Sequence, residues 1–259
     1  MIEHSDIVAA LPLYAPNSAG TAEALAILAI ASANHVFPLL TELAGGIGGR
    51  ALPGVVPAAS LCATAECAAH AARLRHHFDV QGSDKGTGYG YHLVYGARLA
   101  RQPAVTAVLE IGIGTNHQDV VSNMGAAGRP GASLRAFRDA LPAARVYGAD
   151  IDARILFREE RIETFVVDQT SAASLDALGR SIEGDFDLVV DDGLHAPNAN
   201  LSVLIFALPR LKPGGWLVIE DIKPVAVPFW QVVALLLPEG YRPRIVASGG
   251  VVLFVVERA

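Results

Sequence analysis

Cysteine is scarce in this sequence, which holds only Cys62 and Cys67 among 259 residues. They are five residues apart in a segment expected to be helical. A rise of about 1.5 Å per residue would separate them by roughly 8 Å, too far for a disulfide. No neighbouring cluster of ligands accompanies them, so they do not indicate a metal site either. We expect both to be small, reduced core residues.

An excess of positive charge is also absent: 20 Lys and Arg face 26 Asp and Glu, for a net charge of -6. Nucleic acids and anionic membranes bind basic surfaces, so this balance argues against both and favours a small-molecule partner. The N-terminus MIEHSDIVAA lacks a basic region followed by an apolar core. We therefore expect no secretory signal, and a cytoplasmic protein.

No uninterrupted apolar run reaches the length of a membrane span. The most apolar run, 22 to 40, contains Glu23, Asn34, His35 and Pro38, whereas a span needs about 20 predominantly apolar residues. We expect a helix packed on the body or on a second subunit, and hence a homo-oligomer. The Gly/Pro-rich stretch 45 to 57 favours a linker, so residues 1–80 are predicted as a helical appendage and 81–259 as the main domain.

From residue 105 onward, β-rich runs alternate with helical patterns, which predicts an α/β fold with a parallel sheet. Five such runs are VTAVLEIG, ARVYGADI, ETFVVD, FDLVVDD and GWLVIED. Two more, YRPRIVAS and VVLFVVER, are joined by Gly249 and Gly250, a hairpin signal. The pattern therefore predicts a seven-stranded sheet that ends in an antiparallel hairpin.

The first of these strands ends in Glu110, Gly112 and Gly114, where the chain must turn close to a ligand or simply turn tightly. A dinucleotide fingerprint needs a third glycine three residues later, but residue 117 is His. This disfavours NAD and a dehydrogenase.

The next two strands also end in polar residues. Asp150 stands where a carboxylate can accept both ribose hydroxyls of a nucleoside, or be a solvated strand-end acid. Asp168 and Gln169 could form hydrogen bonds with the edge and amino group of an adenine base.

Three further acids follow two β-rich runs: Asp192 in DDGLH, and Glu220 with Asp221 in WLVIED. If the strands are neighbours, these carboxylates converge, and a hard divalent cation would offset their repulsion. His195 could be the base beside that ion, or a helix N-terminal residue bonded to backbone. Asp191 should point away from Asp192, toward the donor or into the structure.

Taken in order, VLEIGIG, YGADID, VVDQ, FDLVVDDG and LKPGGWLVIED resemble the Rossmann-like class I S-adenosylmethionine (SAM)-dependent methyltransferases. GSDKGTGYGYHLVYGARL and DDGLH narrow this to the mycinamicin-type macrolide sugar O-methyltransferases. The narrower resemblance implies Mg²⁺ held by the acids at 192, 220 and 221, the histidine at 195 as base, and a glycosylated acceptor from a natural-product or polysaccharide pathway.

The resemblance also implies that Ser83 or Lys85 meets the carboxylate of the donor; the alternative is that both belong to a solvated loop. The segment 115–131 has its own sequence and is expected to be a lid over the substrate. Two other functions stay open: a metal-independent O- or N-methyltransferase, and a SAM-binding module without catalysis.

Overall fold

The computed structural model describes residues 2–102 and 104–259. They form two compact units. The first unit comprises the residues up to Pro53 together with Val225–Leu236, and the second comprises Gly54–Pro224 and Leu237–Ala259. The first compact unit thus ends at Pro53, and the functional boundary expected near residue 80 stays a prediction.

The first unit is helical. Thr21 begins its main helix, because the Thr21 side chain accepts a hydrogen bond from the backbone N–H of Ala24. Phe37 of this helix packs edge-on against Phe229, with ring centroids 4.9 Å apart. The helices of this unit are α1 (His4–Ala10), α2 (Ala22–Thr41), a π-helical turn (Glu42–Ile47) and α9 (Val227–Leu236).

Helix α2 and the turn that follows it expose an apolar surface. Ala22–Ile47 has a mean hydropathy of 1.7 over its most apolar window and is long enough to cross a membrane by length and composition. Only 11% of that window is buried, and Ile27 and Leu39 are more than half exposed. The expected oligomer interface and the absence of a membrane partner stay predictions.

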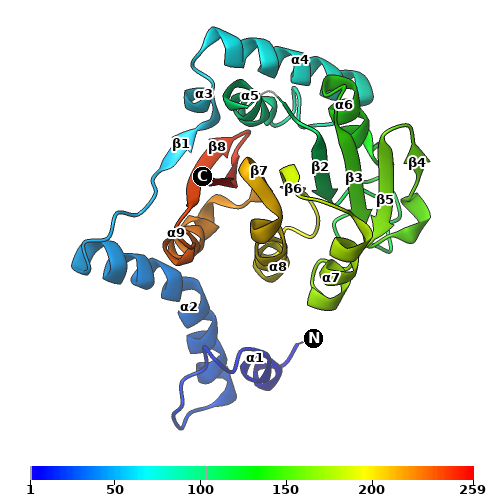
Figure 1. Ribbon diagram of the computed structural model, residues 1–259. Coiled ribbons are helices and arrows are strands. Elements are labelled where there is room, and N and C mark those ends of the chain that lie inside the picture. The colour runs from blue at the N-terminus through cyan, green and yellow to red at the C-terminus, as the bar shows by residue number, and fades with distance from the viewer. Residues whose placement is uncertain (1, 103) are drawn as a thin grey trace. The chain divides into compact units, whose positions relative to one another are not determined.

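The second unit is built on one nine-stranded sheet of order β1-β8-β9-β7-β6-β2-β3-β5-β4 (Figure 1). All seven expected strands are present, and β9 is antiparallel to both of its neighbours, which confirms the terminal hairpin. Two short edge strands, β1 and β4, were not predicted. The strands are β1 (Val55–Pro57), β2 (Ala107–Ile111), β3 (Arg145–Asp150), β4 (Arg158–Glu159), β5 (Ile162–Val166), β6 (Phe186–Asp191), β7 (Leu211–Ile222), β8 (Tyr241–Ser248) and β9 (Val251–Arg258).

Helices cover both faces of this sheet, with α4, α5 and α6 on one side and α7 and α8 on the other (Figure 1). On the first side, the rings of Phe78, Tyr95 and Phe137 lie 5.2 to 6.1 Å apart and join α4, α5 and α6. The helices are α3 (Ala58–Leu61), α4 (Ala65–Gln81), α5 (His92–Arg101), α6 (Ala132–Ala140), α7 (Ala172–Ser181) and α8 (Pro197–Ala207). Single 3-10 turns cover Ala153–Ile155, Leu208–Arg210 and Pro224–Ala226.

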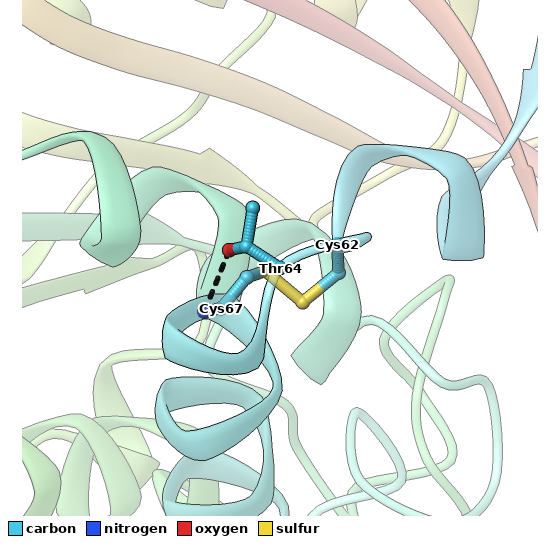
Figure 2. Close-up of a disulfide and its surroundings, with 3 residues drawn as sticks. All are labelled: Cys62, Thr64 and Cys67. Atoms are coloured by element: carbon cyan, nitrogen blue, oxygen red, sulfur yellow. Dashed lines mark hydrogen bonds between the residues drawn. A yellow bond between two sulfur atoms is a disulfide. The ribbon is translucent and has the colours of Figure 1, made fainter.

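The two cysteines form a disulfide (Figure 2), so the expectation of reduced core cysteines was wrong. They do not share a helix: α3 ends at Leu61, and Thr64 begins α4 by accepting a hydrogen bond from the N–H of Cys67. The break brings their Cα atoms to 5.2 Å, within the usual range for a disulfide. Such bonds are rare in cytoplasmic proteins.

The strand order fixes where a ligand can bind. After β2 the chain builds β3 and β5 on one side and then crosses to β6 and β7 on the other. Because the connections diverge at β2, a crevice opens at the carboxyl ends of β2 and β6. Every residue predicted to bind the donor or the metal, other than Ser83 and Lys85, lies within three residues of the carboxyl end of β2, β3, β5, β6 or β7.

Candidate active site

A tight turn follows β2. Gly112 and Gly114 have φ values of +85° and +80°, which side chains rarely tolerate. At Gly112 there is also no room, because a Cβ would lie 2.3 Å from the carbonyl oxygen of Asp192. The glycine turn and Asp192, the first of the predicted metal-binding acids, are therefore in direct backbone contact.

Beside this turn lies a cavity of about 530 Å³. Five predicted donor-binding residues line it, which are Gly112, Gly114, Asp150, Asp168 and Gln169. Asp192, a predicted metal ligand, also lines it, so one cavity joins the two groups of predicted residues. Its size suits a nucleoside-sized ligand.

Asp150 stabilises the wall of this cavity by accepting hydrogen bonds from the backbone. Its carboxylate accepts hydrogen bonds from the backbone N–H groups of Ile113, at 2.9 Å, and Asp152, at 3.0 Å. The sequence reading missed Asp152, which accepts bonds from the Thr115 hydroxyl (2.6 Å) and from Arg154. These bonds hold the pKa of Asp152 well below its usual range. In the sequence, the only sign of a role for Asp152 was its place as the second acid of the motif GADID.

The expected lid also reaches the cavity. Its residues Val120, Val121 and Ser122 are among those that line it. The Ser122 hydroxyl donates to the carbonyl of Gly193 at 2.8 Å, across 71 residues of sequence. This bond ties the segment 115–131 to the loop after β6, while its role as a lid stays a prediction.

Four predicted donor-binding residues are absent from the described lining of the cavity. Ser83 lies in the turn after α4, where its hydroxyl accepts a 3.4 Å hydrogen bond from the N–H of Lys85. Asp191 is fully buried and accepts bonds from Gln169 and Asn200; burial raises its pKa to about 6. The other two, Lys85 and Glu110, face each other at 3.2 Å.

Lys85 is placed among carboxylates. Its ammonium nitrogen lies 2.5 Å from Asp192 Oδ2 and bonds Glu220 Oε2 as well, while the side chain is only 2% exposed. Burial alone would lower the pKa of Lys85, but Asp192, Glu220 and Glu110 outweigh it and raise that pKa. Lys85 is therefore a charged internal counter-ion for three acids.

Three of the predicted residues form a compact cluster. Asp192, His195 and Asp221 each offer a ligand atom, and all three atoms lie within 4.8 Å of one another. His195 Nε2 is 3.9 Å from Asp192 Oδ1 and 3.8 Å from Asp221 Oδ2. The ends of β6 and β7 thus bring Asp221 next to two residues that precede it by 26 and 29 positions.

The backbone that builds this cluster is unusual. His195 and Asp221 have positive φ values of 55° and 56°, a conformation that is uncommon outside glycine. Asp221 lies where the pairing of β7 with β9 shifts register between Ile219 and Ile222. In a regular strand, consecutive side chains point to opposite faces. The irregularity instead lets both Glu220 and Asp221 contact the segment 85–95.

Two tyrosines of that segment complete the site. The hydroxyl of Tyr91 donates to Asp221 Oδ1, and that of Tyr95 donates to Glu220 Oε1. Burial and the neighbouring carboxylates raise the pKa of both phenols, so each remains a donor. Their i, i+4 spacing was visible in the sequence, but it suits ordinary packing equally well.

The chemistry of these residues fits a hard divalent cation. Asp192 and Asp221 each direct one oxygen toward the centre of the cluster, and their side chains are 24% exposed. Carboxylate oxygens with space for further oxygen ligands suit Mg²⁺. Glu220 differs, since Tyr95 and Lys85 bond both of its oxygens, so its place among the ligands stays a prediction.

Comparison with known proteins places this site in a family. The model of a methyltransferase domain family matches residues 85–222, which include the glycine turn and the acid cluster. The chain belongs to this methyltransferase family. The Rossmann-like methyltransferase fold expected from the motifs is thereby confirmed.

Two curated relatives are O-methyltransferases. The 8-demethyl-8-alpha-L-rhamnosyl tetracenomycin-C 2'-O-methyltransferase of Streptomyces olivaceus is 36% identical over 198 residues, which are 76% of this chain and 45% of that protein. The mycinamicin VI 2''-O-methyltransferase of Micromonospora griseorubida is 42% identical over 93 residues, 36% of this chain and 23% of that protein. The chain thus spans less than half the length of these relatives.

Among solved structures, one match is a methyltransferase of the mycinamycin pathway in complex with Mg, SAH and mycinamycin VI. It is 30% identical, covers 57% of this chain and 38% of its own, and has a TM-score of 0.48.

Proposed function

We propose that this methyltransferase is a SAM- and Mg²⁺-dependent O-methyltransferase that acts on a sugar hydroxyl of a glycosylated small molecule. The observation that carries the proposal is the shared cavity, which Gly112, Gly114 and Asp150 line together with Asp192. A donor bound beside the glycine turn would thus be next to the acid cluster. The relatives that methylate sugar hydroxyls support the acceptor class.

Methyl transfer from a sulfonium to an oxygen is an in-line displacement in which the C–S bond breaks as the C–O bond forms. The protein must therefore hold the acceptor in line with the donor. When bound, Mg²⁺ would lower the pKa of a coordinated hydroxyl and fix its position. Asp192 and Asp221 are the residues that would hold it, and Glu220 stays a predicted third ligand.

His195 is the proposed base. Its side chain is 29% exposed, so an acceptor hydroxyl can reach the imidazole, and an imidazole is suited to accept a proton near neutral pH. The proton that leaves the hydroxyl would place a positive charge between Asp192 and Asp221, both within 4 Å of the ring. The two carboxylates would then share their negative charge between the ion and the imidazolium.

The test uses the purified protein with SAM and a panel of rhamnosylated or other glycosylated polyketides, each paired with its aglycone. We expect methylation of the glycosides only, loss of activity in EDTA, and recovery with Mg²⁺. SAH should bind with a measurable enthalpy by calorimetry. Activity that EDTA and Mg²⁺ leave unchanged would instead favour the metal-independent methyltransferase, and SAH binding without any methylation would favour the non-catalytic module.

A further inference from the structure

In each of the two acids that face His195, one carboxylate oxygen bonds a buried donor and the other points toward the histidine. Asp192 gives Oδ2 to Lys85 at 2.5 Å and keeps Oδ1 toward His195 Nε2, at 3.9 Å. Asp221 gives Oδ1 to the hydroxyl of Tyr91 and keeps Oδ2 toward the same nitrogen, at 3.8 Å. In each acid, therefore, the oxygen that does not face His195 is fixed by one hydrogen-bond donor.

Tyr91 is well placed for this task. Its side chain is buried, with only 1% of the residue exposed. Its ring stacks on that of Tyr89, with centroids 5.3 Å apart and planes at 22°. The phenol is therefore a fixed donor, while the Asp221 side chain that it holds is 24% exposed and lies on left-handed backbone. Without the hydrogen bond, that carboxylate would be free to rotate into solvent.

We propose that Tyr91 is a positioning residue for the cation site, which orients Asp221 so that Oδ2 faces the space shared with Asp192 and His195. This inference rests on the proposed metal dependence and names a residue outside the predicted ligand set. Hydrogen-bond partners of metal ligands contribute about 10- to 100-fold in metal affinity. A role in donor binding is not part of it, since Tyr91 is absent from the described lining of the cavity.

Tyr91→Phe tests the proposal, because it removes one oxygen and keeps the stacked ring. Mn²⁺ binding is measured by electron paramagnetic resonance on the protein without donor, and Mg²⁺ binding by calorimetry. We expect both affinities to fall about tenfold or more, with SAH affinity and melting temperature close to wild type. The Mg²⁺ concentration for half-maximal activity should rise by the same factor, and turnover at saturating Mg²⁺ should recover.

Tyr89→Phe is the matched control, since it removes a phenolic oxygen from the other ring of the stack. Its metal affinity should equal that of wild type. Equal metal affinity in Tyr91→Phe and wild type would overturn the inference and leave the proposed function standing. A parallel loss of SAH affinity or of thermal stability in Tyr91→Phe would also overturn it, because the role would then be structural. Wild-type protein that binds neither ion would overturn the metal dependence itself.

Discussion

The ammonium of Lys85 lies 2.5 Å from the carboxylate of Asp192, although 107 residues separate them in sequence. The same ammonium bonds Glu220, so one buried cation joins the turn before α5 to the ends of β6 and β7. The geometry gives Lys85 a role on the acids of the site, while its contact with the donor's carboxylate stays a prediction.

Lys85→Met should therefore destabilise the fold. The change leaves Glu220 and Glu110, both fully buried, without their cation. Removing one partner of a buried ion pair typically costs about 3 to 5 kcal/mol. Urea unfolding at pH 7 measures this free energy, and the exposed Lys223→Met is the control, expected within about 0.5 kcal/mol of wild type. Coincident unfolding curves for wild type and Lys85→Met would contradict the role.

His195→Ala should lower turnover by roughly 100-fold or more, the usual scale for the loss of a general base. SAH affinity measured by calorimetry should stay close to wild type, because His195 does not line the described cavity. His76→Ala, an exposed histidine on α4, serves as the control and should turn over normally. Unchanged turnover in His195→Ala would remove it from the mechanism.

Gly112→Ala should weaken SAH binding at least tenfold. The new Cβ would lie 2.3 Å from the backbone oxygen of Asp192, at a φ of +85°, so the turn or the Asp192 loop must shift. Gly184→Ala separates this clash from backbone strain, since Gly184 has the same φ and no atom within 4 Å of its Cβ position. That control should lose only about 1 to 2 kcal/mol of stability and bind SAH as wild type does. Equal SAH affinities would show that the turn does not contact the donor.

Asp191 should make stability depend on pH. Burial raises its folded-state pKa from 3.8 to about 6, so between these values the folded protein holds a proton that the unfolded chain has lost. Its contribution is therefore favourable at low pH and falls as pH rises from about 4 to 6, by about 3 kcal/mol at most. The wild-type unfolding free energy, minus that of Asp191→Asn, should decrease across this window. A difference that is flat with pH would contradict the raised pKa.

Local sequence patterns were enough for most of the elements. The β-rich runs predicted all seven central strands, and Gly249 with Gly250 marked the hairpin between β8 and β9. The starts of α7 and α2 are local too, since Ser171 and Thr21 cap these helices through their own side chains. The edge strands β1 and β4 escaped notice because three and two residues are too short to show a period.

The cysteines show where local reasoning failed. Their spacing excluded a disulfide only if one helix ran through both, and the cap at Thr64 instead places a break between them. A Thr at residue 64 is visible in the sequence, but the start of a helix there depends on the packing of α4 against α5 and α6, which no local pattern shows.

The sequence by itself determined which residues end each strand, and hence that Gly112, Asp150, Asp192 and Asp221 meet at one edge of the sheet, because parallel strands share a carboxyl edge. Only the tertiary structure decided which side chains bond each of these acids. Lys85, Tyr91 and Tyr95 come from the segment before and within α5, and nothing in their own sequence specifies which strand end they face. That choice depends on how α5 packs on the sheet, which sets which oxygen of each acid is bonded and which is left toward His195.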